Sequence, residues 1–351
     1  MMTFNRLIKH AKYTVFTGLM AVLLALSLGC PWDGNGSDSD GDTDGDGGPP
    51  ATMTYRQDMR DFVEAISAYA KTQNAGFLII PQNGQEIMTL DGESDGAVAS
   101  DYLAAIDGMG REDLFYGYDN DDQATPAAER AYLLGFTDLA VLQGLTVLVT
   151  DYCSTLANVD DSYAQSAARG YVAFAADDRE LRTIPSYPSP VHNVNFTAVE
   201  SLPDARNFLY LLNNEAFGTR QAFLTALDAT AYDLFIIDLY APDGVAFTAS
   251  EIGQLQTKPN GMRRLVLCYI SVGEAEDYRD YWQSGWDTNP PEWIVAENPD
   301  WPGNYKVAYW DPAWQAIIFG SQDAYLDRVL DAGFDGAYLD IIDAFEYFET
   351  L

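Results

Sequence analysis

The sequence predicts an α/β fold built on a parallel sheet, and three of its features indicate this. From about residue 51 onward, amphipathic segments with helical periodicity alternate with short apolar segments. The apolar segments are continuous, as in the strands of a parallel sheet that helices cover. Four strand segments can be counted in residues 76–176 and four in residues 206–340. Eight strand–helix units predict a single (β/α)8 barrel of the TIM-barrel type.

Two doubly wound half-domains would also fit this alternation. Residues 183–205 would join them, because this stretch lacks periodicity and contains four prolines, Pro185, Pro188, Pro190 and Pro203. Doubly wound domains that bind nucleotides carry a glycine-rich phosphate-binding fingerprint after a strand, and no strand segment is followed by one here. The single barrel is therefore the preferred prediction.

The first 50 residues are predicted to lie outside the barrel. Residues 1–30 combine basic side chains with an apolar run that ends at Gly29-Cys30, which is typical of a secretory signal peptide with a lipobox-like end. We expect a secreted protein held at the bacterial outer membrane or cell surface through a lipid on Cys30 alone. Cleavage of an ordinary signal peptide nearby is the alternative. Residues 31–50 are predicted to be a disordered Asp/Gly-rich tether, and calcium binding by this tether stays open.

The half of the barrel in residues 51–182 begins with a helix at residues 58–73. This helix has an apolar stripe of Met59, Phe62, Val63, Ile66 and Tyr69. Further helices are predicted at residues 127–144 and 162–170. The strands of this half are predicted at residues 76–84, 105–117, 145–155 and 171–178.

The half in residues 206–351 repeats the alternation with one long insertion. Its helices are predicted at residues 219–231, 248–261 and 313–333, with Ser250 as a possible N-cap of the second. Its strands are predicted at residues 207–214, at 232–244, from 263 onward and at 334–343. The insertion extends to about residue 310, is rich in Trp and Pro, and ends in a short accessory strand at residues 305–312.

The composition excludes several classes of chemistry. The chain has 53 acidic and 19 basic residues, a formal net charge of −34, so it repels nucleic acid and favours cationic partners or a high-salt environment. With 2 histidines and 3 cysteines, His relays, His-rich metal sites and a disulfide framework are not expected. We predict no cofactor and no metal, and the oligomeric state stays open. Any catalysis must rest on carboxylates.

Carboxylates follow five of the predicted strands. Because parallel strands of a barrel end at one mouth, these side chains are expected to converge there. The acids are Asp107, Glu112, Asp113, Asp151, Asp238, Glu274, Glu276, Asp340 and Asp343. The neighbouring rings and amides are Tyr152, Tyr240, Tyr269, Tyr278, Trp282, Trp310, Gln82 and Asn83. Rings that stack on sugars and carboxylates that accept hydroxyl groups are typical of a carbohydrate site, and two carboxylates can hydrolyse a glycoside.

Each acid also has a structural interpretation. Asp151 could cap the next helix, Asp343 and Glu346 could belong to a solvated helix start, and Asp238 could pair with Arg279. An all-oxygen calcium or magnesium site is the rival use of the whole cluster. Like charges gathered at one mouth cost stability, which favours a functional reason for the group as a whole.

Four segments resemble the TIM-barrel proteins of glycoside hydrolase family 114, whose characterised activity is endo-α-1,4-polygalactosaminidase. They are "YDLFIIDLYAPDG", "LVLCYISVGEAEDYRDYW", "NPDWPGNYKVAYWDPAWQ" and "GFDGAYLDIIDAFEYFE". In that family, segments similar to "GFLIIPQNG", "AIDGMGREDLFYG" and "LTVLVTDYC" come after these four, whereas here they come first. The resemblance therefore implies a circular permutation. Residues 206–351 would be the first half of the family's barrel, residues 51–182 the second, and residues 183–205 the connector. Residues 336–340 should then pair with residues 77–83.

The resemblance also implies roles for individual residues. Asp340 would be the nucleophile or transition-state stabiliser and Glu112 the general acid/base. Asp238, Glu274 and Tyr269 would contact the −1 sugar or its amine, and Gln82, Asn83 and Tyr152 would complete the floor. The remaining predicted substrate contacts are Tyr240, Glu276, Asp151 and Trp310. Glu274 is a second candidate acid, because Gly273 before it can let the backbone approach a ligand.

The substrate implied by the resemblance is a cationic galactosamine-type polysaccharide. The acidic composition suits such a chain, although a high-salt habitat explains the acidity equally well. A non-catalytic glycan-binding lipoprotein on the same barrel is the alternative function. The exact sugar and linkage, the stereochemical outcome, and endo or exo action stay open.

Overall fold

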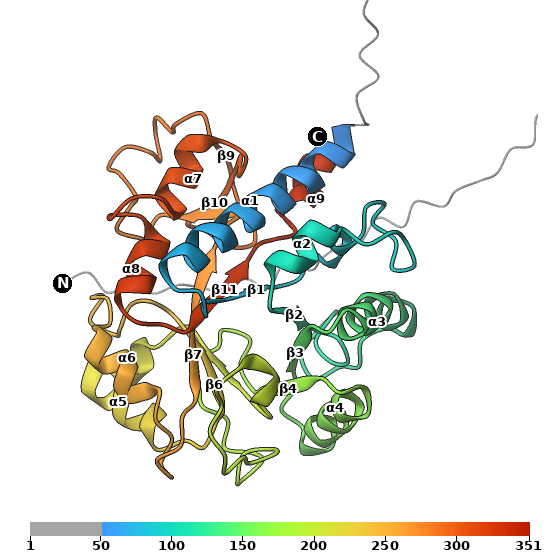
Figure 1. Cartoon of the computed structure of the whole chain (residues 1–351), viewed down its shortest axis with the longest axis vertical. Coiled ribbons are helices and arrows are strands. Elements are labelled where there is room, and N and C mark those ends of the chain that lie inside the picture. Colours follow the sequence, from blue (N-terminus) through green and yellow to red (C-terminus); the bar gives the residue numbers. More distant parts are fainter. Residues whose placement is uncertain (1–50) are drawn as a thin grey trace, which may run out of the picture. The chain divides into compact units, whose positions relative to one another are not determined.

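Eight parallel strands form the centre of the computed structural model, which describes residues 51–351 (Figure 1). The predicted signal peptide, the lipidation of Cys30 and the tether lie outside the described residues. Within residues 51–351, no helix is long and apolar enough to cross a membrane.

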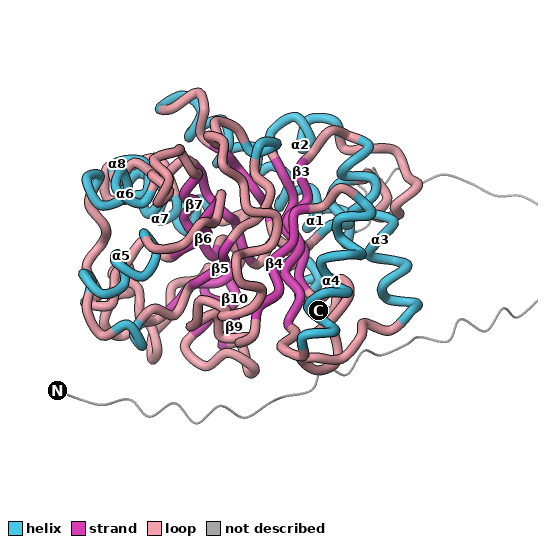
Figure 2. The backbone as a smooth tube through the Cα atoms, turned by 90° about the horizontal axis from the view of Figure 1, so that it is seen from below, coloured by secondary structure: helices cyan, strands magenta, loops and turns pink. Residues whose placement is uncertain are grey.

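Five of the strands form one parallel sheet. Its order is β1 (Leu78–Pro81), β11 (Gly336–Asp340), β7 (Leu265–Ser271), β6 (Leu234–Ile237) and β5 (Leu209–Leu211). The other three form a second parallel sheet in the order β2 (Gly108–Glu112), β3 (Thr146–Tyr152) and β4 (Val172–Ala176). The strands lie in the interior with helices around them (Figure 2). A parallel α/β fold is therefore confirmed.

The two sheets adjoin between β1 and β2. Gln82 and Gly110 form a parallel bridge there, and the Asp107 amide donates to the Ile79 carbonyl at 2.9 Å. At the other edges, β4 and β5 share no ladder within the described part of the chain, although the rings of Phe174 and Phe208 pack 5.6 Å apart. The eight strands thus follow one spatial order, whereas closure into a barrel stays a prediction.

Strands β1 and β11 are neighbours, although they lie near opposite ends of the chain. Leu78 pairs with Gly336 and Pro81 with Leu339 in a parallel register, so the predicted pairing of these strands is confirmed. Helices α1 (Ala51–Gln73) and α9 (Ala344–Glu349) also lie side by side (Figure 1), tied by an ion pair between Arg56 and Glu349 at 2.8 Å. The permutation itself stays a prediction.

The helices bury apolar stripes against these strands. On α1, Met59, Phe62, Val63 and Ile66 are buried, as the stripe predicted. The remaining helices are α2 (Ser100–Ala105), α3 (Ala127–Leu142), α4 (Leu156–Arg169), α5 (Arg220–Asp228), α6 (Ala249–Leu255), α7 (Pro312–Ile318) and α8 (Tyr325–Asp331). Single 3-10 turns occur at Gln85–Met88, Leu202–Asp204 and Glu215–Phe217.

Two sequence predictions about helices are wrong. The single helix expected at residues 313–333 is two helices, α7 and α8, and the chain between them passes through Gly320 in a left-handed conformation, φ 98°. The N-cap of α6 is Thr248 and not Ser250. The amide of Glu251 donates to the Thr248 hydroxyl, while the Glu251 carboxylate accepts from the Thr248 amide at 2.8 Å. This reciprocal pair satisfies two amides that a cap at Ser250 would leave free.

The insertion after β7 forms a small antiparallel sheet, where the sequence predicted a single strand. Its order is β8 (Glu274–Glu276), β10 (Asn304–Val307) and β9 (Ile294–Glu297). Trp282 packs on Tyr305 at 4.7 Å and on Trp286 at 5.3 Å, so aromatic rings supply its core. Because this sheet follows the carboxyl end of β7, it lies at the end of the parallel strands where Asp340 and Glu112 also lie.

The connector at residues 183–205 is tied to the strands by a buried ion pair. Lys258 donates to Asp233 at 2.8 Å and to the carbonyls of Asn195 and Thr197 at 2.9 and 2.8 Å. The other oxygen of Asp233 accepts from the Arg206 amide at 2.9 Å. The charged groups of Lys258 and Asp233 both have hydrogen-bond partners, and these bonds make residues 183–205 an integral part of the fold.

Candidate active site

Asp340 and Glu112 meet because their strands flank the same neighbour. Asp340 is the last residue of β11, Glu112 is the last of β2, and Gln82 follows β1 between them. The Gln82 side-chain amide donates to Asp340 Oδ1 at 2.8 Å and to Glu112 Oε2 at 2.9 Å. One nitrogen therefore bridges the two carboxyl groups, and these two bond lengths together set the greatest possible distance between the bridged oxygens.

Three further side chains donate to the same two carboxyl groups. Asn83 donates to Glu112 Oε2 at 3.1 Å, and the Tyr152 hydroxyl donates to Glu112 Oε1. The Tyr269 hydroxyl donates to Asp340 Oδ2 at 2.7 Å. The structure thus brings together Asp340 and Glu112 with four of the other residues that the sequence singled out: Gln82, Asn83, Tyr152 and Tyr269.

This pair of acids holds a proton more tightly than isolated carboxyl groups do. Burial and the adjacent Glu112 carboxylate raise the pKa of Asp340 well above its usual range. Two carboxyl groups this close titrate as one coupled unit, because ionising both would place two negative charges side by side. Near neutral pH the pair therefore retains one proton, which is the state needed to protonate a leaving group.

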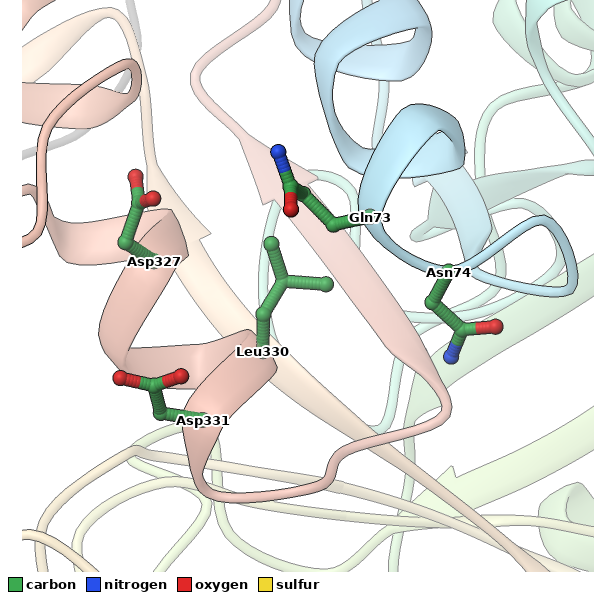
Figure 3. Close-up of a pocket in the computed structure, with 5 residues that line it drawn as sticks. All are labelled: Gln73, Asn74, Asp327, Leu330 and Asp331. Carbon is green, nitrogen blue, oxygen red and sulfur yellow. The ribbon is translucent and has the colours of Figure 1, made fainter.

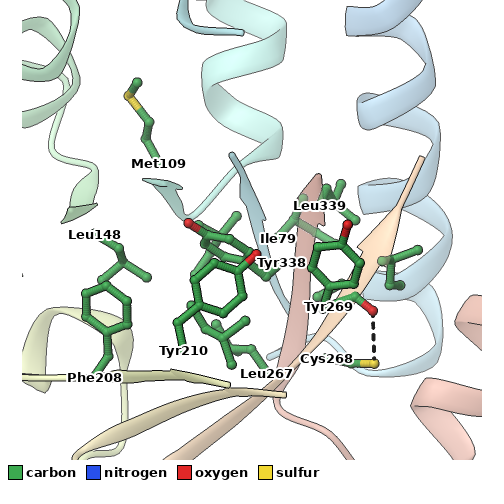
Figure 4. Close-up of a cluster of buried hydrophobic side chains, with 14 of the residues drawn as sticks. Ile79, Met109, Leu148, Phe208, Tyr210, Leu267, Cys268, Tyr269, Tyr338 and Leu339 are labelled. Carbon is green, nitrogen blue, oxygen red and sulfur yellow. Dashed lines mark hydrogen bonds between the residues drawn. The ribbon is translucent and has the colours of Figure 1, made fainter. Parts of the chain in front are cut away.

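Two buried tyrosines form the floor beneath the pair, and sequence reasoning missed both. Tyr210 on β5 and Tyr338 on β11 pack edge to face, with their ring centroids 5.2 Å apart (Figure 4). Burial and the charges of Asp340 and Glu112 raise the pKa of both phenols far above their usual range, so both stay neutral. A Cβ atom at Gly110 would lie 2.0 Å from the Tyr338 hydroxyl, so only glycine fits. A glycine inside a strand was the available signal for this close approach.

Asp238 and Glu276 converge on a different partner, Arg279. The guanidinium lies 2.7 Å from Asp238 and 2.6 Å from Glu276, and all three side chains are largely buried. The alternative interpretation of Asp238 as a partner of Arg279 is therefore confirmed. The hydroxyl of Tyr240, two residues after Asp238, accepts a hydrogen bond from Arg328 at 2.6 Å.

Glu274 faces the accessory sheet. It accepts from Asn298 at 2.8 Å and forms an ion pair with Lys306 at 3.2 Å. Gly273 serves close packing of the backbone, because a Cβ atom there would lie 2.2 Å from the Ile341 carbonyl oxygen. Glu274 was a second candidate acid because Gly273 could let a ligand approach the backbone. In the structure it is the Ile341 backbone that approaches Gly273, and not a ligand site.

Asp151 and Trp310 contact other parts of the molecule. Asp151 is fully buried and accepts from the amides of Phe115 and Tyr116 and from the Ser162 hydroxyl at 2.9, 3.2 and 2.6 Å. It holds the loop after β2, whereas the N-cap of α4 is Thr155. The rings closest to Trp310 belong to Tyr309, Tyr55 and Phe348, at 5.0, 5.2 and 4.7 Å.

The backbone adopts a left-handed conformation directly after Gln82 and directly after each of the two acids that Gln82 bridges. Asn83 follows Gln82 with φ 59°, Asp113 follows Glu112 with φ 57°, and Ile341 follows Asp340 with φ 60°. Asn and Asp tolerate this region, but a β-branched residue does so only at a cost. Such strain concentrates at functional sites, where the surrounding packing holds it in place.

Within the described residues, neither a group of metal ligands nor the pocket between α1 and α8 lies at Asp340 and Glu112. Among residues 51–351, no group of three or more His, Cys, Asp or Glu side chains is placed to hold a metal ion. A pocket of about 240 Å³ lies between the end of α1 and α8 (Figure 3), lined by Gln73, Asn74, Asp327, Leu330 and Asp331. It adjoins the segments that lead into β1 and β11, which is the opposite end of these strands from Asp340.

Comparison with known proteins gives one family and three relatives. Residues 202–350 match the family model of glycoside-hydrolase family GH114, which supports a glycosidase activity; this segment contains Asp340 but not Glu112. An uncharacterized protein of Deinococcus radiodurans is 44% identical over 37% of this chain and 39% of its own length. Uncharacterized proteins of Thermotoga maritima and Methanocaldococcus jannaschii are 42% and 39% identical, over 40% and 44% of this chain and 40% and 41% of their own lengths. The chain thus spans about two fifths of the length of these relatives.

Proposed function

We propose that this protein is a glycoside hydrolase that cleaves an amino-sugar polysaccharide of the galactosamine type with Asp340 and Glu112. The observation that carries the proposal is the Gln82 bridge between two acids that end neighbouring strands. The GH114 match supports the reaction class, and the resemblance of the motifs supports the substrate class.

The spacing of the pair favours retention of configuration. The two bonds to Gln82 Nε2, 2.8 and 2.9 Å, keep the bridged oxygens closer than the about 6.5–9.5 Å typical of inverting enzymes. A separation of about 5–5.5 Å, as in retaining enzymes, lies within reach. One carboxylate attacks the anomeric carbon while the other acid protonates the leaving oxygen. Water, deprotonated by that second group, then releases the sugar from the first.

The resemblance assigns the attack to Asp340 and the proton transfer to Glu112. In the structure, Tyr269 donates to Asp340, while Tyr152, Asn83 and Gln82 donate to Glu112. These donors orient both carboxyl groups, and the proton that the pair retains is the one that the general acid transfers to the leaving oxygen. Rescue with azide separates the roles through the configuration of the product. Azide that replaces the nucleophile in an Asp340→Gly variant yields the inverted β-glycosyl azide, whereas azide that attacks the glycosyl-enzyme of a Glu112→Gly variant yields the retained α-glycosyl azide. If Glu112→Gly yields the inverted β-glycosyl azide instead, the two roles are exchanged.

The closed barrel and the circular permutation belong to the same proposal. The strand order β5-β6-β7-β11-β1-β2-β3-β4 supports both, because it becomes sequential when residues 206–351 are placed before residues 51–182. A rearranged gene that starts at residue 206, joins residue 351 to residue 51 and ends at residue 182 should give an active, folded enzyme. Failure of this variant to fold would count against the permutation but not against the catalytic pair.

We also propose that the enzyme is secreted and held at the bacterial surface by a lipid on Cys30. The support is the signal-like sequence before Cys30 and the Asp/Gly-rich stretch after it. Incorporation of radiolabelled palmitate that depends on Cys30 tests this. A Cys30→Ala variant that is labelled like the wild type would contradict it.

Product analysis on a panel of amino-sugar polymers tests the activity. Release of reducing ends from deacetylated α-1,4-linked galactosamine chains is expected, and matched acetylated galactosamine and glucosamine chains define the selectivity. Saturable binding without products would identify the protein as a glycan-binding module and overturn the enzyme proposal.

A further inference from the structure

Most acids at this end of the strands already have a cationic partner. Arg279 forms ion pairs with both Asp238 and Glu276, and Lys306 forms one with Glu274. Asp343 differs, because its side chain has no hydrogen bond or ion pair with any residue of the described chain. It occupies the N-cap position of α9, yet its carboxylate makes no capping bond. A partly buried carboxylate without a partner forgoes the stabilisation that such a position normally supplies.

The backbone holds Asp343 in a fixed position beside the catalytic pair. The turn at residues 341–343 lies between two glycines of neighbouring strand ends. A Cβ atom at Gly84 would lie 2.7 Å from the Ile342 side chain and 3.0 Å from the Asp343 amide, and one at Gly273 would meet the Ile341 carbonyl. Because Ile341 is held at φ 60° within this turn, the position of Asp343 relative to Asp340 is set by packing and not by a loose loop.

Charged side chains of both signs surround Asp343, but none forms a hydrogen bond or ion pair with its carboxylate within residues 51–351. Burial raises the pKa of Asp343 to about 6, the nearby Arg111 guanidinium opposes this rise, and the Glu86, Glu274 and Glu112 carboxylates add to it. Arg111 already donates to Gln85 at 3.0 Å. Glu86 is 7% exposed, and its second carboxyl oxygen has no hydrogen-bond partner within residues 51–351. The Asp343 carboxylate and one oxygen of Glu86 therefore lack a hydrogen-bond partner within residues 51–351, and a cation beside Asp343 would stabilise its carboxylate.

We propose that Asp343 is the carboxylate that binds the ammonium group of the substrate sugar and makes the enzyme selective for a free amine. This inference rests on the proposed function, since it assumes that a sugar lies against Asp340 and Glu112. It gives the amine to an acid without an ion pair, whereas the resemblance gave it to Asp238 and Glu274, which already form ion pairs with Arg279 and Lys306.

The preference of the ammonium group for Asp343 over Asp238 follows from the ion pair that Asp238 already has. An ammonium group at Asp343 forms a new charge-assisted hydrogen bond with a carboxylate that has no hydrogen bond or ion pair within residues 51–351. At Asp238 it would have to compete with a guanidinium at 2.7 Å. An N-acetylated sugar is neutral and bulkier, so it would leave Asp343 desolvated and unpaired, which penalises its binding.

The test compares Asp343→Asn with wild-type enzyme on matched polymers. One polymer is deacetylated α-1,4-galactosamine and the other is the same chain N-acetylated, both at one fixed ionic strength. The ratio of kcat/KM for the amine over the acetylated chain should fall about 10- to 100-fold in Asp343→Asn, mainly through KM. Glu346→Gln is the matched control, because it removes an exposed carboxyl group from the first turn of the same helix, α9, and should leave the ratio within about twofold.

Two results would overturn the inference. One is an unchanged ratio in Asp343→Asn, and the other is an equal loss of activity on both polymers, which indicates a role in the reaction and not in amine recognition. Failure of both Asp343→Asn and Asp343→Ser to fold would also contradict it, because the proposal requires that the side chain make no native contact.

The experiment also separates this inference from the proposed function. If wild-type enzyme cleaves neither polymer, hydrolysis is refuted, and calorimetric titration of the full protein with D-galactosamine and D-galactose then tests amine binding directly. Preference for galactosamine that disappears in Asp343→Asn would support the inference. Absence of that preference in wild-type protein would overturn it.

Discussion

Two pairs of acids at the same end of the strands differ in what holds them together. Asp340 and Glu112 are bridged by the neutral amide of Gln82, whereas Asp238 and Glu276 are bridged by the guanidinium of Arg279. The positive charge of the guanidinium stabilises the ionised form of both acids of its pair. The amide supplies geometry without charge, so the Gln82-bridged pair keeps a proton and remains reactive. The charge of the bridging residue is therefore the main difference between the proposed catalytic pair and the Arg279-bridged pair.

The largest expected effect comes from removing either acid of the Gln82-bridged pair. Asp340→Asn and Glu112→Gln should each lower kcat by about 10³-fold or more, since each removes a group that the two-step mechanism requires. Stability should be unchanged or higher, because each substitution relieves like-charge repulsion. Reducing-end assays beside thermal unfolding measure both effects, and an active Asp340→Asn variant would refute the assignment.

The Arg279-bridged pair should respond in the opposite way. Arg279→Met leaves two buried acids without a counter-charge and should lower the free energy of unfolding by about 3–5 kcal/mol. Gln82→Met, which removes two hydrogen bonds from an uncharged donor, should lower it by about 1–3 kcal/mol. Urea unfolding of both variants provides the comparison. Equal destabilisation by the two would show that the charge of the bridging residue does not matter.

The Gln82-bridged pair should also make the stability of the protein depend on pH. The pKa of Asp340 is raised in the folded state, so above about pH 4, where an unfolded aspartate ionises, the folded protein binds more protons. Stability should therefore fall as the pH rises through this window up to the raised pKa, and Asp340→Asn should flatten that slope. In parallel, kcat should decline as the pair loses its last proton. Unfolding midpoints measured across this range decide the point, and an identical slope in Asp340→Asn would contradict it.

A smaller effect is expected from the phenol that orients Asp340. Tyr269→Phe removes one hydrogen bond of 2.7 Å but preserves the ring packing, so kcat should fall about 10-fold. The same phenol also stabilises the ionised form of Asp340, so the decline of kcat with pH should move to higher pH. A fall in kcat without this displacement would indicate that Tyr269 acts on the substrate alone.

The strands and the catalytic candidates could be predicted because their signals are local. Continuous apolar runs such as residues 336–339 indicate buried parallel strands, and Asp340 and Glu112 were chosen because each ends such a run. The adjacency of β1 and β11 could not come from local pattern, and it was predicted only through the resemblance.

The remaining site residues could not be sorted from the sequence, because partner choice depends on the fold. Asp238, Glu274 and Glu276 have the same residue types as the catalytic acids, and their pairing with Arg279 and Lys306 depends on where the insertion places those two cations. The side on which Trp310 packs depends on α1 and α9, which meet from opposite ends of the chain. Tyr210 and Tyr338 read as core residues, and only Gly110 signalled the close contact at Tyr338.

One measurement tests the central claim most directly. Proton NMR can follow the first sugars released from a deacetylated α-1,4-galactosamine polymer by the wild type, Asp340→Asn and Glu112→Gln, before mutarotation. The Gln82-bridged pair predicts α-anomers from the wild type and no product from either variant. β-Anomers appearing first, or product from both variants, would contradict the account.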